Sequence, residues 1–70
     1  MYIVCEIQTT GDQVATLVTS YADRLEAESK YHSVLASAAI SSVPKHGALM
    51  FDEDGNPLMR ACYHHGEVTA

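Results

Sequence analysis

Two glycine-containing turns constrain this chain more than any other feature of its sequence. Gly11-Asp12 and Asp54-Gly55 are dipeptides typical of tight turns. Each turn separates two short runs that are rich in β-branched and aromatic residues, which favour strands. The four predicted strands are residues 2–9, 13–21, 46–52 and 57–64. The sequence therefore predicts two β-hairpins, one on each side of a central segment.

The central segment predicts one helix, because it is rich in Ala, Leu, Glu and Lys. Asp23 is placed to cap its N-terminus, with Glu26 in the capping-box position. Val43-Pro44 ends it, at about Ser41 or Ser42. The resulting ββαββ order, in a chain of 70 residues, predicts a two-layer α+β fold with one helix on a mostly antiparallel four-stranded sheet. We expect a single domain over 1–66 and a frayed tail over 67–70.

The predicted strands place apolar side chains on both of their faces. Ile3, Cys5 and Ile7 share one face of the first strand, while Tyr2 and Val4 lie on the other. One helix covers only one face of a sheet, so the second face would be left apolar in water. We therefore expect a homodimer or higher homo-oligomer that buries the second face. The alternative is that loops and edges of the same chain cover it.

Charge composition limits the partners that the chain can take. Four Lys and Arg residues against nine Asp and Glu residues give a net charge of −5, so we expect no direct binding of nucleic acid through its phosphates. The acidity serves either solubility or mimicry of a polyanion. No apolar run is long enough to span a membrane, and the N-terminus does not resemble a signal peptide. Two cysteines without a secretory signal indicate reduced thiols and a cytoplasmic protein, although a Cys5–Cys62 disulfide stays open.

The helix carries two polar residues on its apolar arc. Glu28 and His32 lie one turn apart among Leu25, Leu35 and Ala39 on a helical wheel. A glutamate that faces a core needs a partner, and a histidine four residues later can supply one. The pair is therefore either a satisfied structural contact at the rim of the core or part of a ligand pocket.

Cationic and protonatable groups suggest an anion site. The few such groups include Lys30, Lys45, His46 and Arg60, and in an oligomer they could surround a small anion, with Tyr31 or Tyr63 stacking on a base. The alternative is that they are ordinary surface charges. The candidate ligand-binding residues are Glu28, Lys30, Tyr31, His32, Lys45, His46 and Arg60. Neither metal-ligand spacing nor a nucleophile motif is present, so we expect no metal, no cofactor and no enzymatic activity.

Several segments together resemble small uncharacterised proteins encoded by phages and prophages of anaerobic Gram-positive bacteria. The segments are Glu26-Ala27-Glu28-Ser29-Lys30-Tyr31-His32, Ala36 to Ile40, Ser42-Val43-Pro44-Lys45-His46 and Asp54-Gly55-Asn56. The resemblance covers nearly the whole chain and carries no assigned chemistry. It implies an accessory protein that acts against host defence in the host cytosol.

Three functions follow as hypotheses. The first is a homo-oligomer that sequesters a small anionic, nucleotide-like immune signal of the host. The second is an acidic inhibitor, of the anti-CRISPR type, that presents its acidic surface to a nucleic-acid-binding defence enzyme. The residues of that surface are Glu26, Asp52, Glu53 and Asp54. The third is a structural or regulatory dimer without a ligand.

Overall fold

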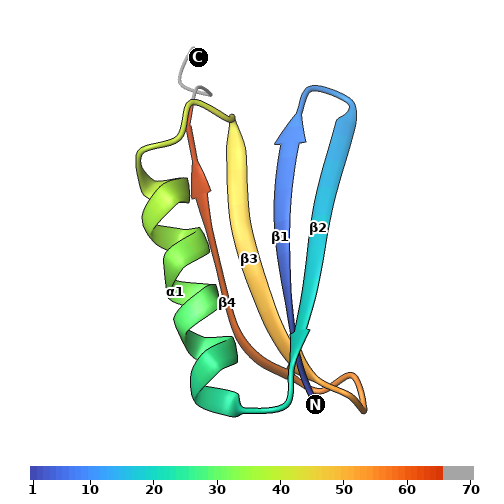
Figure 1. Cartoon of the computed structure of the whole chain (residues 1–70). Coiled ribbons are helices and arrows are strands. Elements are labelled where there is room, and N and C mark those ends of the chain that lie inside the picture. The colour runs from blue at the N-terminus through green and yellow to red at the C-terminus, as the bar shows by residue number, and fades with distance from the viewer. Residues whose placement is uncertain (66–70) are drawn as a thin grey trace.

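Both predicted hairpins form, and they lie next to each other in one antiparallel sheet (Figure 1). The computed structural model describes residues 1–65. The elements are β1 (Tyr2–Thr10), β2 (Gln13–Tyr21), α1 (Arg24–Ala39), β3 (Lys45–Asp52) and β4 (Pro57–His64). The described residues thus form one helix and a four-stranded sheet, which confirms the α+β fold with ββαββ order. The predicted tail over 67–70 lies outside the described residues.

The sheet has the strand order β2-β1-β3-β4, in which every neighbouring pair is antiparallel. The two hairpins are joined by the pairing of β1 with β3. In this register Val4 lies opposite Met50, Glu6 opposite Ala48 and Gln8 opposite His46. The pairing therefore brings residues near the start of the chain against residues about 40 positions later.

The two turns are built differently. Gly11 has φ 62°, and within residues 1–65 positive φ occurs only at glycines, so Thr10 and Gln13 are joined by a two-residue type II′ turn. In the second turn, Asp52 Oδ1 accepts hydrogen bonds from the backbone N–H groups of Asp54 and Asn56, both at 2.9 Å. Next to this longer turn, the pairing of β3 with β4 has a register shift between Met50 and Phe51. The second hairpin is consequently irregular where the first is regular.

Helix α1 begins where the sequence predicts. The side chain of Asp23 accepts a hydrogen bond from the Leu25 backbone N–H at 3.3 Å, which satisfies one of the free donors at the N-terminus. The helix ends at Ala39, so the predicted end at Ser41 or Ser42 is too late. The Ser41 hydroxyl accepts a hydrogen bond from the Val43 backbone N–H at 3.0 Å, and this local bond competes with helical geometry.

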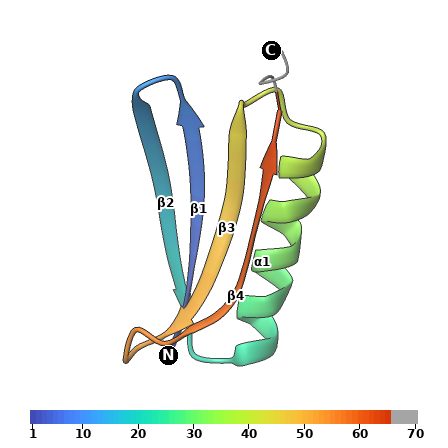
Figure 2. The same ribbon diagram turned by 180° about the vertical axis from the view of Figure 1, so that it is seen from behind.

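The core lies between α1 and the two central strands. Its buried side chains are Val4, Ala27, Tyr31, Val34, Ala48 and Met50. In both views α1 lies on the side of β3 and β4, while β2 forms the far edge of the sheet (Figures 1 and 2). Within residues 1–65, no helix has the length and apolar character that crossing a membrane requires.

Candidate functional site

The sheet face opposite α1, called the open face below, is apolar at its centre and cationic at one side. The strand registers place on it Ile3, Cys5, Ile7 and Thr9 of β1, Val14, Thr16, Val18 and Ser20 of β2, Lys45, Gly47, Leu49 and Phe51 of β3, and Arg60, Cys62 and His64 of β4. None of the acidic residues within 1–65 lies on this face. Within the described residues, this acidic chain therefore presents one face without negative side chains.

A hollow of 470 Å³ opens on this face over the centre of β3 and β4. Ile7, Leu49 and Cys62 contribute its apolar wall, and Arg60 contributes a guanidinium group. The hollow exists partly because Gly47 has no side chain. A Cβ atom at Gly47 would lie only 2.5 Å from the Ala61 carbonyl oxygen, so this position excludes every other residue without a movement of β4.

Arg60 is the distinctive residue of the hollow. It is exposed, and no acidic side chain of residues 1–65 lies within ion-pair distance of it. Lys45 lies on the same face at the beginning of β3, also without an ion pair in the described part of the chain. A guanidinium group binds carboxylates and phosphates through paired hydrogen bonds. The open face can therefore hold an anion that also has an apolar part.

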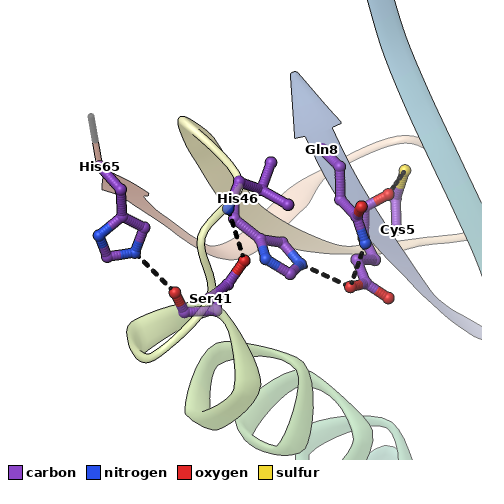
Figure 3. A network of polar contacts seen from close by, with 8 residues as sticks. Cys5, Gln8, Ser41, His46 and His65 are labelled. Carbon is purple, nitrogen blue, oxygen red and sulfur yellow. Dashed lines mark hydrogen bonds and ion pairs between the residues drawn. The ribbon is translucent and has the colours of Figure 1, made fainter. Parts of the chain in front are cut away.

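The opposite face contains a buried polar cluster between β1 and β3. His46 is only 4% exposed, and its Nε2 lies 2.6 Å from Glu6 Oε2. Gln8 Nε2 donates to the same oxygen at 3.1 Å. Figure 3 shows His46 and Gln8 pointing toward the carboxylate between them. Among the described residues, His46 Nδ1 has no hydrogen-bond partner.

The environment of Glu6 favours its charged form. The hydrogen bond from His46 lowers the pKa of the Glu6 carboxyl, and desolvation opposes this effect in part. The hydrogen bond from Gln8 and the positive charges of His46 and Lys30 lower the pKa further. Because the carboxylate has its partners inside the protein, the cluster stabilises the fold and is not an open anion site.

The structure contradicts the predicted placement of Glu28 and His32 on the apolar arc. Glu28 accepts a hydrogen bond from Arg24 Nε at 2.9 Å at the helix surface. His32 is exposed, and its ring forms a T-shaped contact with the Tyr31 ring, with the two ring centroids 5.3 Å apart. The buried stripe of α1 is narrower than the wheel suggested, since it consists of Ala27, Tyr31, Val34 and Ala38. Two of these four are alanines, which bring the helix backbone close to the sheet.

The remaining predicted ligand residues are divided between the two faces. Tyr31 is 3% exposed in the core, where desolvation raises the pKa of its hydroxyl and where it cannot stack on a ligand. His46 belongs to the buried cluster, and Lys30 acts on that cluster from the helix. Of the predicted set, the open face brings together only Lys45 and Arg60.

Sequence reasoning missed Glu6, Gln8 and Gly47. One signal was available for the first two, because Glu6 and Gln8 continue the alternation of Tyr2 and Val4 on one face of β1. A charged residue on such a face needs a buried partner. No comparable signal exists for Gly47, whose role depends on how closely β4 approaches it.

Other chemistry is limited within the described residues. Cys5 and Cys62 are both free thiols. Within residues 1–65, no group of three His, Cys, Asp or Glu side chains is placed to hold a metal ion. Comparison of the chain with protein-family models, curated proteins and solved structures found no match.

Proposed function

We propose that this chain is a small non-enzymatic binding protein that sequesters an anionic, nucleotide-like ligand between the open faces of two copies. The observation that carries the proposal is the position of Arg60. It is an arginine without an ionic partner in the described part of the chain, inside a hollow with apolar walls, on a face that has no acidic residue among those described.

The apolar character of the open face supports association with a second copy. Ile7, Leu49 and Phe51 are only partly buried within one chain, and removing apolar area from water contributes roughly 25 cal/mol per Å². A second copy presents an identical apolar face. Two-fold association of identical faces is the commonest form of homodimer.

The same association creates a requirement for an anion. Two open faces that close on each other also remove Arg60 of each copy from water, and a charge buried without a partner is strongly destabilising. An anion held between the two guanidinium groups removes this cost and adds charge-assisted hydrogen bonds. Ligand binding and association are therefore coupled in this proposal.

The hollow suits a phosphate group attached to a flat apolar body. Its volume of 470 Å³ lies within the roughly 300–1,000 Å³ that is usual for small-molecule sites. Arg60 supplies the paired donors for a phosphate, and Phe51 on the same face can stack on a base. Lys45 adds a second cation at the beginning of β3. A nucleotide combines these properties, and the acidic chain as a whole disfavours long nucleic acids.

The resemblance to phage accessory proteins supports a counter-defence role in the host cytosol, in which the ligand is a nucleotide signal of the host immune system. An acidic inhibitor surface has less support, because two of its residues have internal partners. Asp52 accepts hydrogen bonds from Asp54 and Asn56 inside the turn. Glu53 Oε1 lies 2.6 Å from the amino nitrogen of Met1.

Isothermal titration with a panel of cyclic dinucleotides tests the proposal. We expect at least one member of the panel to release heat on binding to the wild-type protein, and Arg60→Ala to weaken that binding about tenfold or more, since one bidentate contact is lost. Arg24→Ala is the matched control, because it removes an arginine from the helix and leaves the open face unchanged. In native mass spectrometry, we expect addition of the ligand to double the number of copies per particle and to add the mass of the bound ligand. If no member of the panel releases heat, the proposal is contradicted. The structural or regulatory dimer without a ligand is then the remaining hypothesis.

A further inference from the structure

Strand β2 is an unusually unprotected edge of the sheet. It is nine residues long, and its sequence QVATLVTSY contains no charge, proline or glycine. Its residues 13–18 and 20 are all exposed. The exposed fractions of Val14, Leu17 and Val18 are 62%, 58% and 58%. Natural edge strands are usually protected against pairing by charges, prolines or bulges, and β2 has none of these among its residues.

The other edge strand, β4, carries such protection. It begins with Pro57, which has no N–H group to donate to an added strand, and it has Arg60 at its centre. The register shift between Met50 and Phe51 also disturbs its pairing near the turn. The two edges of one sheet therefore differ in whether another strand can add to them.

The type II′ turn determines which backbone groups of β2 are free. Thr10 and Gln13, which flank this two-residue turn, form a hydrogen-bonded pair, and such pairs alternate along an antiparallel ladder. The odd-numbered residues of β2 therefore bond to β1. The N–H and C=O groups of Val14, Thr16, Val18 and Ser20 point outward, where residues 1–65 provide no neighbouring strand.

We propose that β2 pairs antiparallel with β2 of a second copy, which joins two four-stranded sheets into one continuous sheet. Full overlap of the nine residues places Leu17 opposite Leu17 of the second copy at the two-fold axis. The outward-pointing residues then face each other in hydrogen-bonded pairs, with Thr16 opposite Val18 and Val14 opposite Ser20. Because the strand has no charge, the pair contains no like-charge contact.

The arrangement of the chain leaves room for this partner. Helix α1 lies on the side of β3 and β4 in both views, away from β2 (Figures 1 and 2). Leu17 projects on the helix side of the sheet and is 58% exposed because α1 does not reach it. A second copy therefore adds its strand without contact between the helices. The pairing buries Leu17 of both copies.

This pairing is independent of the proposed ligand, because it uses backbone groups at the edge and leaves the open face free. In the absence of any nucleotide we expect two copies per particle from edge pairing alone. A ligand that joins open faces would then bring the number to four. The two proposals can therefore fail separately.

Thr16→Pro tests the edge pairing. It removes one outward N–H group, whereas a proline at a neighbouring odd-numbered position would break a bond to β1. Thr16→Val is the matched control, because it keeps the β-branched shape and the N–H group. In sedimentation equilibrium without nucleotide, we expect dimers for the wild-type protein and Thr16→Val, and monomers for Thr16→Pro. A monomeric wild-type protein overturns the proposal.

A cysteine at the two-fold axis tests the register without relying on proline. Leu17→Cys is made with Cys5→Ala and Cys62→Ser, since both native cysteines are free thiols. Opposed residues in a non-hydrogen-bonded pair have Cα atoms about 4.5 Å apart, within disulfide range. We expect oxidation to give a covalent dimer on a non-reducing gel. Val14→Cys in the same background is the control, because its partner is Ser20 and it should stay monomeric on the gel. Equal cross-linking at both positions, or none at Leu17→Cys, overturns the pairing.

Arg60→Ala separates the two proposals. We expect this variant to keep the nucleotide-free dimer and the Leu17→Cys cross-link, because Arg60 lies on β4 and not on β2. A loss of the dimer in Arg60→Ala would overturn the edge pairing. An unpaired Arg60 disfavours association of the open faces, so its removal cannot weaken a dimer held by β2.

Discussion

The two faces of the sheet differ in whether a charged strand residue has a partner within the described part of the chain. On the helix side, the Glu6 carboxylate is held by His46 and Gln8 and is largely withdrawn from water. On the open face, Arg60 stands over a hollow without an ionic partner in the described part of the chain. A strand residue can therefore be charged for two reasons. Its partner is either supplied by a neighbouring strand or has to come from outside the chain.

The two faces differ in burial because α1 covers only one of them, and not because their strand residues differ. Met50 and Leu49 are consecutive residues of β3 with similar apolar side chains. Met50 is 0% exposed under α1, whereas Leu49 on the open face is only partly buried. Matched substitutions on the two faces therefore measure what the helix contributes.

The largest effect is expected for truncation in the core. Met50→Ala should lower the free energy of unfolding by about 2–5 kcal/mol, because it removes a fully buried side chain and leaves a cavity. Leu49→Ala should cost about 1 kcal/mol or less in the ligand-free protein. Urea unfolding at one fixed protein concentration measures both. Equal losses would show that the open face is already packed in the free protein.

A smaller effect is expected when a charge is removed from either face. Glu6→Ala should cost about 2–3 kcal/mol, since it leaves His46 buried without its partner. Arg60→Ala, the counterpart on the open face, should change the free energy of unfolding by less than about 0.5 kcal/mol. The same urea experiment measures both variants. A large loss for Arg60→Ala would mean that this arginine has a structural role.

The smallest effect on the free energy of unfolding is expected from lowering the pH. The pKa of Glu6 in the folded protein lies below its ordinary value of 4.5, with the His46 hydrogen bond as the main cause. The unfolded state therefore binds the proton more readily, so the contribution of this carboxylate is present above about pH 4.5 and is lost as the pH falls through the lowered pKa. Asp52 changes in the same direction, because its hydrogen bonds from Asn56 and Asp54 lower its pKa.

Glu6→Gln isolates the contribution of Glu6 to this acid dependence. We expect the difference in free energy of unfolding between the wild-type protein and Glu6→Gln to shrink as the pH is lowered through this window. The difference between the wild-type protein and Arg60→Ala should stay constant over the same range. Thermal unfolding at a series of pH values measures both, and parallel curves for all three proteins would contradict the assignment to Glu6.

Local signals in the sequence were sufficient for the elements of this fold. Gly11 and Gly55 have the positive φ angles that the predicted turns need, and Asp23 caps the helix as predicted. The two-sided apolar pattern of the strands also follows from alternation alone. These features depend on residues a few positions apart, where sequence patterns are informative.

The polar cluster could not be predicted in the same way. Glu6 and His46 are 40 positions apart and meet only because β1 pairs with β3, and the sequence does not give the order of the strands. The helical wheel likewise shows which residues share a face, but it does not show how closely the sheet approaches. For this reason it places Glu28 on the apolar arc, although Glu28 is not among the buried residues of α1.

The central position of β1 has a consequence for how the chain folds. β1 is synthesised before both of its neighbours, and one of them, β3, follows only after β2 and α1. Tyr2 and Asp52 are paired in the finished sheet, so the core closes only after most of the chain has emerged. Contacts of such long sequence separation are associated with slow folding, because the loop between them has to close first. During that interval the N-terminal hairpin exists alone, and its uncharged outer strand is exposed to other nascent chains.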